Sequence, residues 1–333
     1  MGHAGPMAVP AEPVADEPRL SAAALAQLVK IDVFWSLAPF VWTWGIIVAS
    51  VVLQARWGRL YTLPLAMLMV ARSQHALAIL MHEGAHARVL PSRAWNDLVG
   101  SWFAGYPVLI ALPAYRKVHL VHHRDPLAAT DPDLVLTSGY PVARKVLLRR
   151  LARDLLGLTF LKILSYLLTG TTARARKKAR SAGTTAKPAN YYDRGFALGE
   201  VAKGLVAQAI LLAVFWALGR PELYVLLWLL PFTTMLQVLL RLRGLADHAG
   251  LPEPTADAPL PQHARTRTVI SNPVTRFFLA PLHVGYHLEH HLYVGLPWYR
   301  LRAAHLLLRP AYEASGAPVV CGYLEVYRSL TGS

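Results

Sequence analysis

The chain is poor in charge and almost free of cysteine. Charged side chains make up 16% of its 333 residues, whereas a typical soluble domain has about 25%. The single cysteine, Cys321, excludes an intrachain disulfide, so no cysteine-ligated zinc or iron–sulfur site is expected. The first twenty residues lack the basic region and apolar stretch of a signal peptide. We expect residues 1–20 to form a disordered N-terminal tail.

The chain contains several long apolar runs with few charged residues. Val33–Leu53, Leu60–Met81 and Leu223–Leu240 reach the length of about 20 residues that a membrane-spanning helix needs. Leu205–Leu218 reaches this length only if residues 201–204 are added, and these include a lysine. A large buried helical core in a soluble protein is the alternative, but unbroken runs of this length are rare there. The runs therefore predict four transmembrane helices in two hairpins.

Two further segments are apolar but too broken or too charged to be full spans. Residues 98–112 contain two glycines and a proline and read as re-entrant or interfacial. Residues 147–168 carry five charges and read as one amphipathic interfacial or shallow re-entrant helix, followed by a flexible basic stretch at 170–190. The predicted fold is an all-α integral membrane domain over residues 21–310 with a cytosolic histidine-rich cap, followed by a C-terminal tail at 311–333.

The charge that is present is mostly positive and clustered. Lysine and arginine number 34 against 19 acidic residues, giving a net charge of +15, with basic groups at 144–153 and 174–180. Nucleic-acid binding is one interpretation, and docking of an acidic redox partner is another. Beside apolar spans, however, basic groups mark the cytoplasmic side and attract anionic lipid. We expect no nucleic-acid partner, and a protein of the bacterial inner membrane whose functional site faces the cytoplasm.

Histidines fall into three clusters with short spacings. Because residues i, i+3 and i+4 share a helix face, we expect each cluster to direct its imidazoles at a common point. Imidazole binds iron, zinc, copper or nickel, and eight imidazoles exceed what one tetrahedral zinc needs. A ninth histidine follows the fourth apolar run. The pattern predicts a two-metal site, and its candidate ligands are His82, His86, His119, His122, His123, His248, His287, His290 and His291.

The other histidines and the nearby acidic residues are weaker candidates for a role in the site. His75 and His283 are candidates for positions just outside the ligands, and His75 is a candidate for a substrate tunnel. His3, His263 and His305 look incidental. Glu83 is expected to orient an imidazole through its second nitrogen. Further acids that could do so are Asp97, Asp125, Asp131, Asp133, Asp247 and Glu289.

Two other classes of protein compete with a two-metal enzyme. The stretch from His82 to His86 also matches H-E-x-x-H, the pattern of zinc proteases with Glu83 as general base, but this leaves six clustered histidines without a role. A metal-binding or transport protein without catalysis is the second competitor. A transporter should have ionisable residues at mid-membrane, and the apolar runs offer only Arg72 and His75, both in the cytoplasmic half.

The clusters also resemble a known family. HEGAH (82–86), HLVHH (119–123) and GYHLEHHLYVGLPWYRL (285–301) resemble the three boxes of the membrane fatty acid desaturase/hydroxylase superfamily, and the resemblance covers about residues 60–301. It implies two non-haem iron ions, O₂ as co-substrate, and a separate electron donor such as ferredoxin with its reductase. It also makes the nine histidines the ligands and catalytic residues, with His248 as the family's extra ligand. Gly244 departs from members that have a water-holding asparagine there, and many relatives have asparagine in place of His283.

The resemblance implies an oxidation of a lipid. The expected reaction is O₂-dependent desaturation of a fatty acyl chain carried as acyl-lipid, acyl-CoA or acyl carrier. Hydroxylation or ketolation of a lipid or carotenoid by the same centre is the alternative, because the outcome depends on the fine placement of one substrate carbon.

Overall fold

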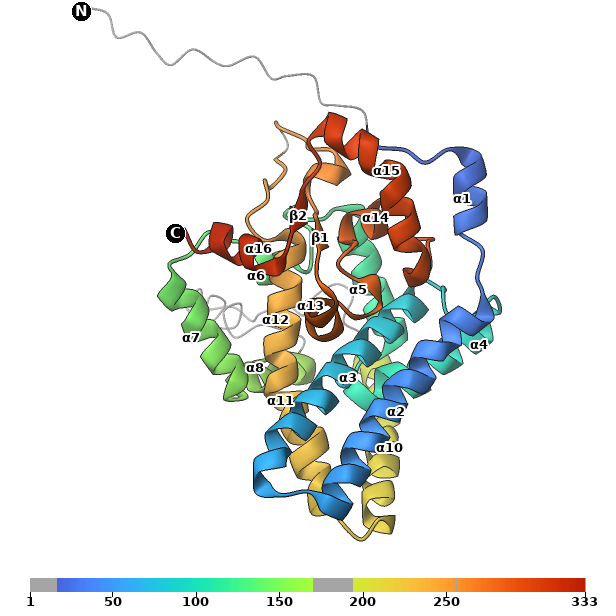
Figure 1. The fold of residues 1–333 in the computed structure, drawn as a ribbon, viewed down its shortest axis with the longest axis vertical. Coiled ribbons are helices and arrows are strands. Elements are labelled where there is room, and N and C mark those ends of the chain that lie inside the picture. Colours follow the sequence, from blue (N-terminus) through green and yellow to red (C-terminus); the bar gives the residue numbers. More distant parts are fainter. Residues whose placement is uncertain (1–16, 170–193, 256, 333) are drawn as a thin grey trace, which may run out of the picture.

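The computed structural model describes residues 17–169, 194–255 and 257–332. The flexible stretch expected at 170–190 and most of the expected N-terminal tail therefore lie outside the described residues. Long helices gather into a bundle that extends from a cap built mainly by the C-terminal third of the chain (Figure 1). Most of the described residues are helical, as predicted.

Four helical stretches are long and apolar enough to cross a membrane, at the positions that the sequence predicts. The first begins where the side chain of Asp32 accepts a hydrogen bond from the backbone N–H of Trp35, a standard helix N-cap. The second ends at Ala85, with His86 as its C-cap residue and Ala87 in a left-handed conformation with φ 58°, six residues before the predicted stop at Pro91. The four stretches are α2 (Val33–Trp57), η1–α3 (Leu60–Thr62 and Leu63–Ala85), most of α10 (Arg194–Ala217), and η4–α11–α12 (Tyr224–Leu229, Leu230–Thr233 and Met235–His248).

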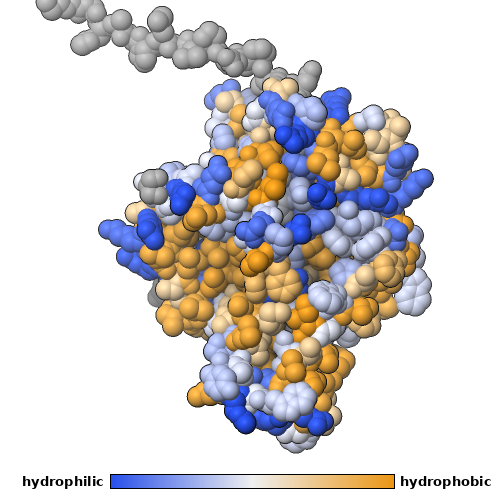
Figure 2. Space-filling model, in the orientation of Figure 1, coloured by the Kyte–Doolittle hydropathy of each residue, from blue (hydrophilic) through white to orange (hydrophobic). Residues whose placement is uncertain are grey.

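The outward faces of these helices are apolar. Trp42 is 65% exposed, Trp57 71%, Leu205 61% and Trp216 72%. Figure 2 shows hydrophobic residues spread over the flanks below the cap. Exposed apolar surface of this extent marks contact with lipid or with another protein.

The segment expected to be re-entrant is broken. It consists of α4 (Arg93–Gly100), η2 (Ser101–Gly105), η3 (Tyr106–Val108) and α5 (Leu112–Arg124). Its two halves meet at 92°, and Leu109 between them adopts a left-handed conformation with φ 56°. Gln208 of α10 donates to the carbonyl of Pro107 at 2.8 Å, which satisfies backbone freed by the break. The bend is what turns α5 toward the cap.

One predicted helix is two. We expected a single helix over 147–168, but the structure has α7 (Arg144–Leu155) and α8 (Leu158–Thr169) after the short α6 (Leu134–Thr137). Gly157 between α7 and α8 has φ 73°, a conformation that a helix interior does not contain and that glycine adopts at little cost. The amphipathic pattern predicts helical structure on both sides of Gly157 but not the turn at Gly157.

The cap corrects the strictly all-α prediction. Strands β1 (Thr268–Ile270) and β2 (Val319–Cys321) pair in parallel, Thr268 opposite Val319, and strands of three residues leave too little pattern to be predicted. The segment set apart as a C-terminal tail holds β2 and α16 (Tyr323–Leu330), and Tyr323, Val326 and Leu330 are buried against the cap. The remaining cap elements are α1 (Ala22–Leu28), η5 (Gln262–Ala264), α13 (Pro273–Leu279), η6 (Pro281–His283), α14 (His287–Leu292), η7 (Trp298–Arg300) and α15 (Leu301–Ser315).

Candidate metal centre

Where the spans meet the cap, the nine predicted histidines converge. Two groups form, and within each group one ring nitrogen per residue lies within 4.8 Å of all the others. The first group has five members and the second has four. The first consists of His82, His86, His119, His123 and His290, and the second consists of His122, His248, His287 and His291.

Four helices supply these side chains. The end of α3 gives His82, and His86 follows as its C-cap residue. The last two turns of α5 give three histidines, the last residue of α12 is His248, and the short helix α14 gives the remaining three. The Pro-containing break before α5 and the fold of the cap over α3 are therefore what bring the motifs together.

The distribution of histidines corrects one expectation. Each H-x-x-H-H cluster was expected to point at a single position, but each is shared between both groups. In α5, His119 and His123 belong to the first group and His122 to the second; in α14, His290 belongs to the first and His287 with His291 to the second. Residues i and i+4 are separated by about 40° around a helix and i and i+3 by about 60° on the other side. A helix lying between two sites can thus serve both.

In the first group the Nε2 atoms form a closely spaced chain. His86 and His119 are 3.1 Å apart, His119 and His123 2.9 Å, and His123 and His290 3.0 Å, each measured between Nε2 atoms. Neither ring nitrogen of His82 has a hydrogen-bond partner among the residues that the structure describes, although the side chain is buried. Buried polar atoms are normally paired, so His82 lacks a partner of the kind that a metal would supply.

In the second group the Nε2 atoms are equally close. Those of His248 and His287 are 3.0 Å apart, and those of His287 and His291 3.1 Å. The rings of His123 and His291 stack with centroids 4.2 Å apart, so the two groups are in direct contact. Two adjoining positions for metal ions follow from this arrangement.

The donor set fits iron better than structural zinc. The five imidazoles of the first group exceed the four ligands of a tetrahedral site. Imidazole is a good ligand for iron, which these residues would hold.

Burial keeps several of the imidazoles neutral. It lowers the pKa of His287, His290 and His291 well below its usual range, and nearby Arg243 adds to this effect at His287. Burial also lowers the pKa of His86 to about 3, and Arg88 adds to the shift. A neutral imidazole retains the lone pair that binds a metal.

Several imidazoles contact a neighbouring residue through Nδ1, the ring nitrogen that faces away from the proposed metal position. Asp131 lies 3.0 Å from Nδ1 of His122, and the backbone carbonyl of Arg265 accepts from Nδ1 of His248 at 2.8 Å. The hydroxyl of Tyr115 is 3.3 Å from Nδ1 of His119. Such contacts fix the tautomer and direct Nε2 toward the metal position. Of the acids predicted for this role, Asp131 makes the clearest contact.

The other predicted acids have different partners. Asp247 pairs with Arg243 at 2.9 Å and is 3.8 Å from His287. Asp133 is 3.9 Å from His122, Asp97 binds Arg116, and Asp125 binds Arg124. None of these four makes a hydrogen bond to a histidine of either group among the described residues.

The expected role of Glu83 is wrong. Its Oε1 is 3.7 Å from Nδ1 of His82, too far for a hydrogen bond, and its Oε2 accepts the backbone N–H of Trp298 at 3.0 Å. Glu83 therefore ties α3 to η7, which follows the third histidine motif. This contact joins sequence positions more than two hundred residues apart.

His305 is the main functional neighbour that sequence reasoning missed. We took it as incidental, but its Nδ1 lies 2.6 Å from Oε1 of Glu289, the acid inside the third motif, and Thr268 donates to Oε2 of the same carboxylate at 2.5 Å. His305 lies on the buried face of α15 with Leu301, Ala304 and Leu308. A histidine on the apolar face of an amphipathic helix was the available signal.

His75 and His283 lie outside both groups. His75 is fully buried two turns before His82, and neither of its ring nitrogens makes a hydrogen bond, although the backbone of Phe278 lies close. His283 packs against the ring of Trp298 with centroids 5.6 Å apart. At Gly244, one turn before His248, a Cβ would meet nothing within 4 Å. The structure leaves open space where some family members have an asparagine.

The fold and the site define a helical protein with span-length apolar helices and two adjoining groups of histidines, each of which could hold a metal ion. The profile of the fatty acid desaturase family matches residues 57–323. The chain belongs to this family, and relatives that are oxidoreductases support the same enzyme class for it.

Two characterised proteins show the range of the family around this chain. A dihydrorhizobitoxine desaturase of Bradyrhizobium elkanii is 29% identical over 250 residues, which is 72% of this chain and 66% of that protein. A beta-carotene ketolase of Paracoccus sp. (strain N81106 / MBIC 01143) is 28% identical over 235 residues, 68% of this chain and 72% of that protein. The two names describe different reactions, so similarity alone does not assign the reaction.

Proposed function

We propose that this protein is a membrane-bound, O₂-dependent desaturase of a fatty acyl chain. Its nine converging histidines would hold two iron ions, five imidazoles at one position and four at the other. The observation that carries the proposal is this pair of groups, placed at the end of span-length apolar helices in a chain of the desaturase family. Positive charge beside the spans supports placing the site on the cytoplasmic side.

The proposed reaction balances as a four-electron reduction of O₂. Two hydrogens leave adjacent methylene carbons and a C=C bond forms; with two electrons and two protons from outside, O₂ becomes two waters. Bound iron would supply the oxygen activation that amino-acid side chains lack. The protein itself would direct two of the imidazoles, His122 and His248, through Asp131 and the carbonyl of Arg265. A separate ferredoxin with its reductase would deliver the two electrons.

Oxygen insertion is the second candidate. The relative from Paracoccus is named a ketolase, and the same metal centre would serve both outcomes. Hydroxylation leaves one oxygen atom on the substrate carbon and releases one water, whereas desaturation leaves none. The mass of the product separates the two reactions.

The test combines metal analysis with product analysis. The full chain is purified from iron-supplemented cells and compared with His290→Ala, and with His3→Ala as a control that removes a histidine outside all motifs. We expect about two irons per chain, fewer in His290→Ala, and lipids that lack two hydrogens only in cells with an intact centre. A single zinc per chain, unaffected by His290→Ala, would overturn the proposal and favour a zinc protease built on His82 and His86.

A further inference from the structure

Helix α15 is apolar on two sides, and only one of them is covered. The covered side packs into the cap through residues such as Leu301 and Leu308. On another side, four exposed apolar residues follow the helical spacing i, i+3, i+4 and i+7: Ala303, Leu306, Leu307 and Pro310. Leu306 and Leu307 are each 57% exposed. A helix that is apolar over most of its circumference is normally buried, so the exposed side has the composition of an interface.

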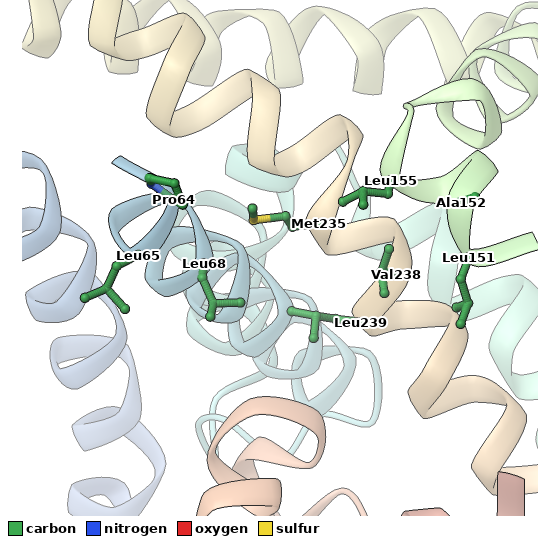
Figure 3. A pocket seen from close by; sticks show the side chains of 9 residues that line it. All are labelled: Pro64, Leu65, Leu68, Leu151, Ala152, Leu155, Met235, Val238 and Leu239. Carbon is green, nitrogen blue, oxygen red and sulfur yellow. The ribbon is translucent and has the colours of Figure 1, made fainter. Parts of the chain in front are cut away.

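This exposed side lies away from the span-length helices. Figure 1 shows α15 in the cap, above the upper ends of α2 and α3. The basic helix α7 differs, because its Leu151, Ala152 and Leu155 line an apolar pocket of about 520 Å³ together with residues of α3 and α12 that belong to the spans (Figure 3). Helix α7 is therefore level with the spans, whereas α15 is not. An exposed apolar face outside the spans marks a contact with another protein.

The covered side of α15 is bonded to the helix that carries the third histidine motif. His305 lies on this side, and its Nδ1 is 2.6 Å from Oε1 of Glu289. Glu289 immediately precedes His290 of the first group and follows His287 of the second group by two residues. Covalent and hydrogen bonds couple an electron donor to an acceptor better than empty space does. The exposed helix thus has a continuous bonded connection to ligands of both groups.

Positive charge flanks the exposed apolar side. Arg302 precedes Leu306 by four residues and Arg309 follows it by three, so both lie next to it on the helix surface. Arg309 pairs with Glu313 at 2.9 Å, whereas Arg302 is exposed and pairs with no acid among the described residues. The whole chain carries a net charge of +15. Local charge and the field of the whole chain therefore both favour an acidic partner.

We propose that the exposed side of α15 is the docking surface for an acidic one-electron carrier protein that reduces the metal centre. The carrier covers Leu306 and Leu307, its carboxylates lie against Arg302, and its electron passes through His305 and Glu289 to α14. Each docking oxidises one reduced carrier and delivers one electron. Two dockings supply the two electrons of one desaturation, and the two protons come from solvent. The inference rests on the proposed function, which needs these electrons, and adds where their donor binds.

The experiment measures docking and electron transfer separately, on the full chain in detergent micelles. The probe is an acidic [2Fe–2S] ferredoxin. Its affinity and association rate are measured on immobilised protein at low and high salt, and reduction of protein-bound iron by reduced ferredoxin is followed by stopped-flow absorbance. The variants are Arg302→Glu and Leu306→Gln. Arg149→Glu, which reverses an exposed cation in the other basic cluster on α7, is the matched control. Dithionite, a small reductant that needs no docking surface, reduces the same samples in parallel.

We expect Arg302→Glu to slow association about ten-fold at low salt and much less at high salt, because screening weakens the attraction. Leu306→Gln should weaken binding about five-fold, with the salt dependence of the wild type, because it removes an apolar contact and no charge. Both variants should slow reduction by ferredoxin in proportion. Arg149→Glu should have a much smaller effect, and dithionite should reduce all four proteins equally.

Absence of ferredoxin binding by the wild type, or wild-type binding by both Arg302→Glu and Leu306→Gln, would overturn the proposal. A larger loss in Arg149→Glu would also overturn it, because the carrier would then dock on α7. The same holds for a wild-type dimer that Leu306→Gln separates without a change in ferredoxin binding, since a second copy would then cover α15. Iron content and reduction by dithionite report separately on the proposed metal centre, because ferredoxin binding is measured whether or not iron is present.

Discussion

The two histidine groups differ in how their outer nitrogens are held. In the second group, Nδ1 of His122 faces the carboxylate of Asp131 and Nδ1 of His248 donates to the carbonyl of Arg265. Both partners accept a hydrogen bond, so both imidazoles are fixed in the tautomer whose Nε2 binds a metal.

The first group has fewer such contacts. Within the described part of the chain, Nδ1 of His82 and Nδ1 of His123 have no hydrogen-bond partner, and Nδ1 of His119 has only the hydroxyl of Tyr115 at 3.3 Å. His86 is the one member of either group that is not fully buried. The first group has more ligands and less support, whereas the second has fewer ligands and more support. The support of the second group is partial, because Nη2 of Arg243, a donor, lies 3.2 Å from Nδ1 of His287, and Nδ1 of His291 has no hydrogen-bond partner among the described residues.

The largest expected effect comes from removing one ligand from each group. His248→Ala leaves three imidazoles in the second group, whereas His82→Ala leaves four in the first. We expect both changes to abolish turnover, because both metal positions take part. His248→Ala should lower iron from about two to about one per chain, and His82→Ala should retain more than that. Iron per chain is measured by elemental analysis with protein quantified by amino-acid analysis. Equal iron loss would show that ligand number does not distinguish the groups.

The next effect tests the outer contacts directly. Asp131→Asn weakens the contact with His122, and outer partners of this kind are worth about 10–100-fold in metal affinity. Tyr115→Phe removes only a long contact between a neutral hydroxyl and His119, and we expect it to cost several-fold less. Affinity is measured by competition with a chelator. A larger loss in Tyr115→Phe than in Asp131→Asn would reverse the comparison.

The sequence alone predicts which histidines belong to the site. Spacings of three and four residues place histidines on one side of a helix wherever that helix lies, and apolar length alone locates the four span-length helices. Local spacing therefore predicted eight of the nine histidines that the structure brings together, and His248 was predicted from its position after the fourth apolar run and from the family resemblance.

The sequence does not predict which histidine belongs to which group, because this depends on how α14 lies against α3 and α5. Contacts such as Glu83 with the backbone of Trp298, and His305 with Glu289, join separate elements. Each half of such a contact has an ordinary local environment in the sequence. The parallel pairing of β1 with β2, about fifty residues apart, is hidden for the same reason.

A third prediction concerns α14, one of the two helices that serve both groups. His305→Gln removes the close partner of Glu289, whose side chain is fully buried in α14. A buried acceptor that loses its partner costs about 1–3 kcal/mol, so we expect a lower melting temperature. Because α14 supplies ligands to both groups, iron should be lost from both equally. Arg309→Gln, which breaks an exposed pair with Glu313 on the same helix α15, is the control and should change little. Iron loss confined to one position would contradict this account.

Two glycines lie near the metal ligands, one beside each group. Replacing them by alanine should change the melting temperature in opposite directions. Gly84 lies between His82 and His86, and a Cβ there would be 2.7 Å from Cδ1 of buried Leu112 and 3.3 Å from Cα of Gly100. Gly84→Ala would therefore force the Leu112 side chain of α5 to shift and would tighten the contact with Gly100 of α4, and overpacking of this kind costs about 1–3 kcal/mol. We expect a lower melting temperature together with weaker iron binding at the first group. An unchanged melting temperature would show that the Leu112 side chain can shift freely.

Gly244 precedes His248 of the second group by one turn of α12, and there a Cβ would meet nothing within 4 Å. Gly244→Ala should stabilise the protein by about 0.4–1 kcal/mol, because alanine restricts the unfolded chain and fits a helix interior. Since Arg265 already holds His248 in place, a stiffer helix should leave iron affinity unchanged while the melting temperature rises. Thermal unfolding and chelator competition on the same preparation give both quantities. Tighter iron binding in Gly244→Ala would mean that the second group is not fully ordered by its hydrogen bonds, and the contrast between the two groups would be smaller than their contacts indicate.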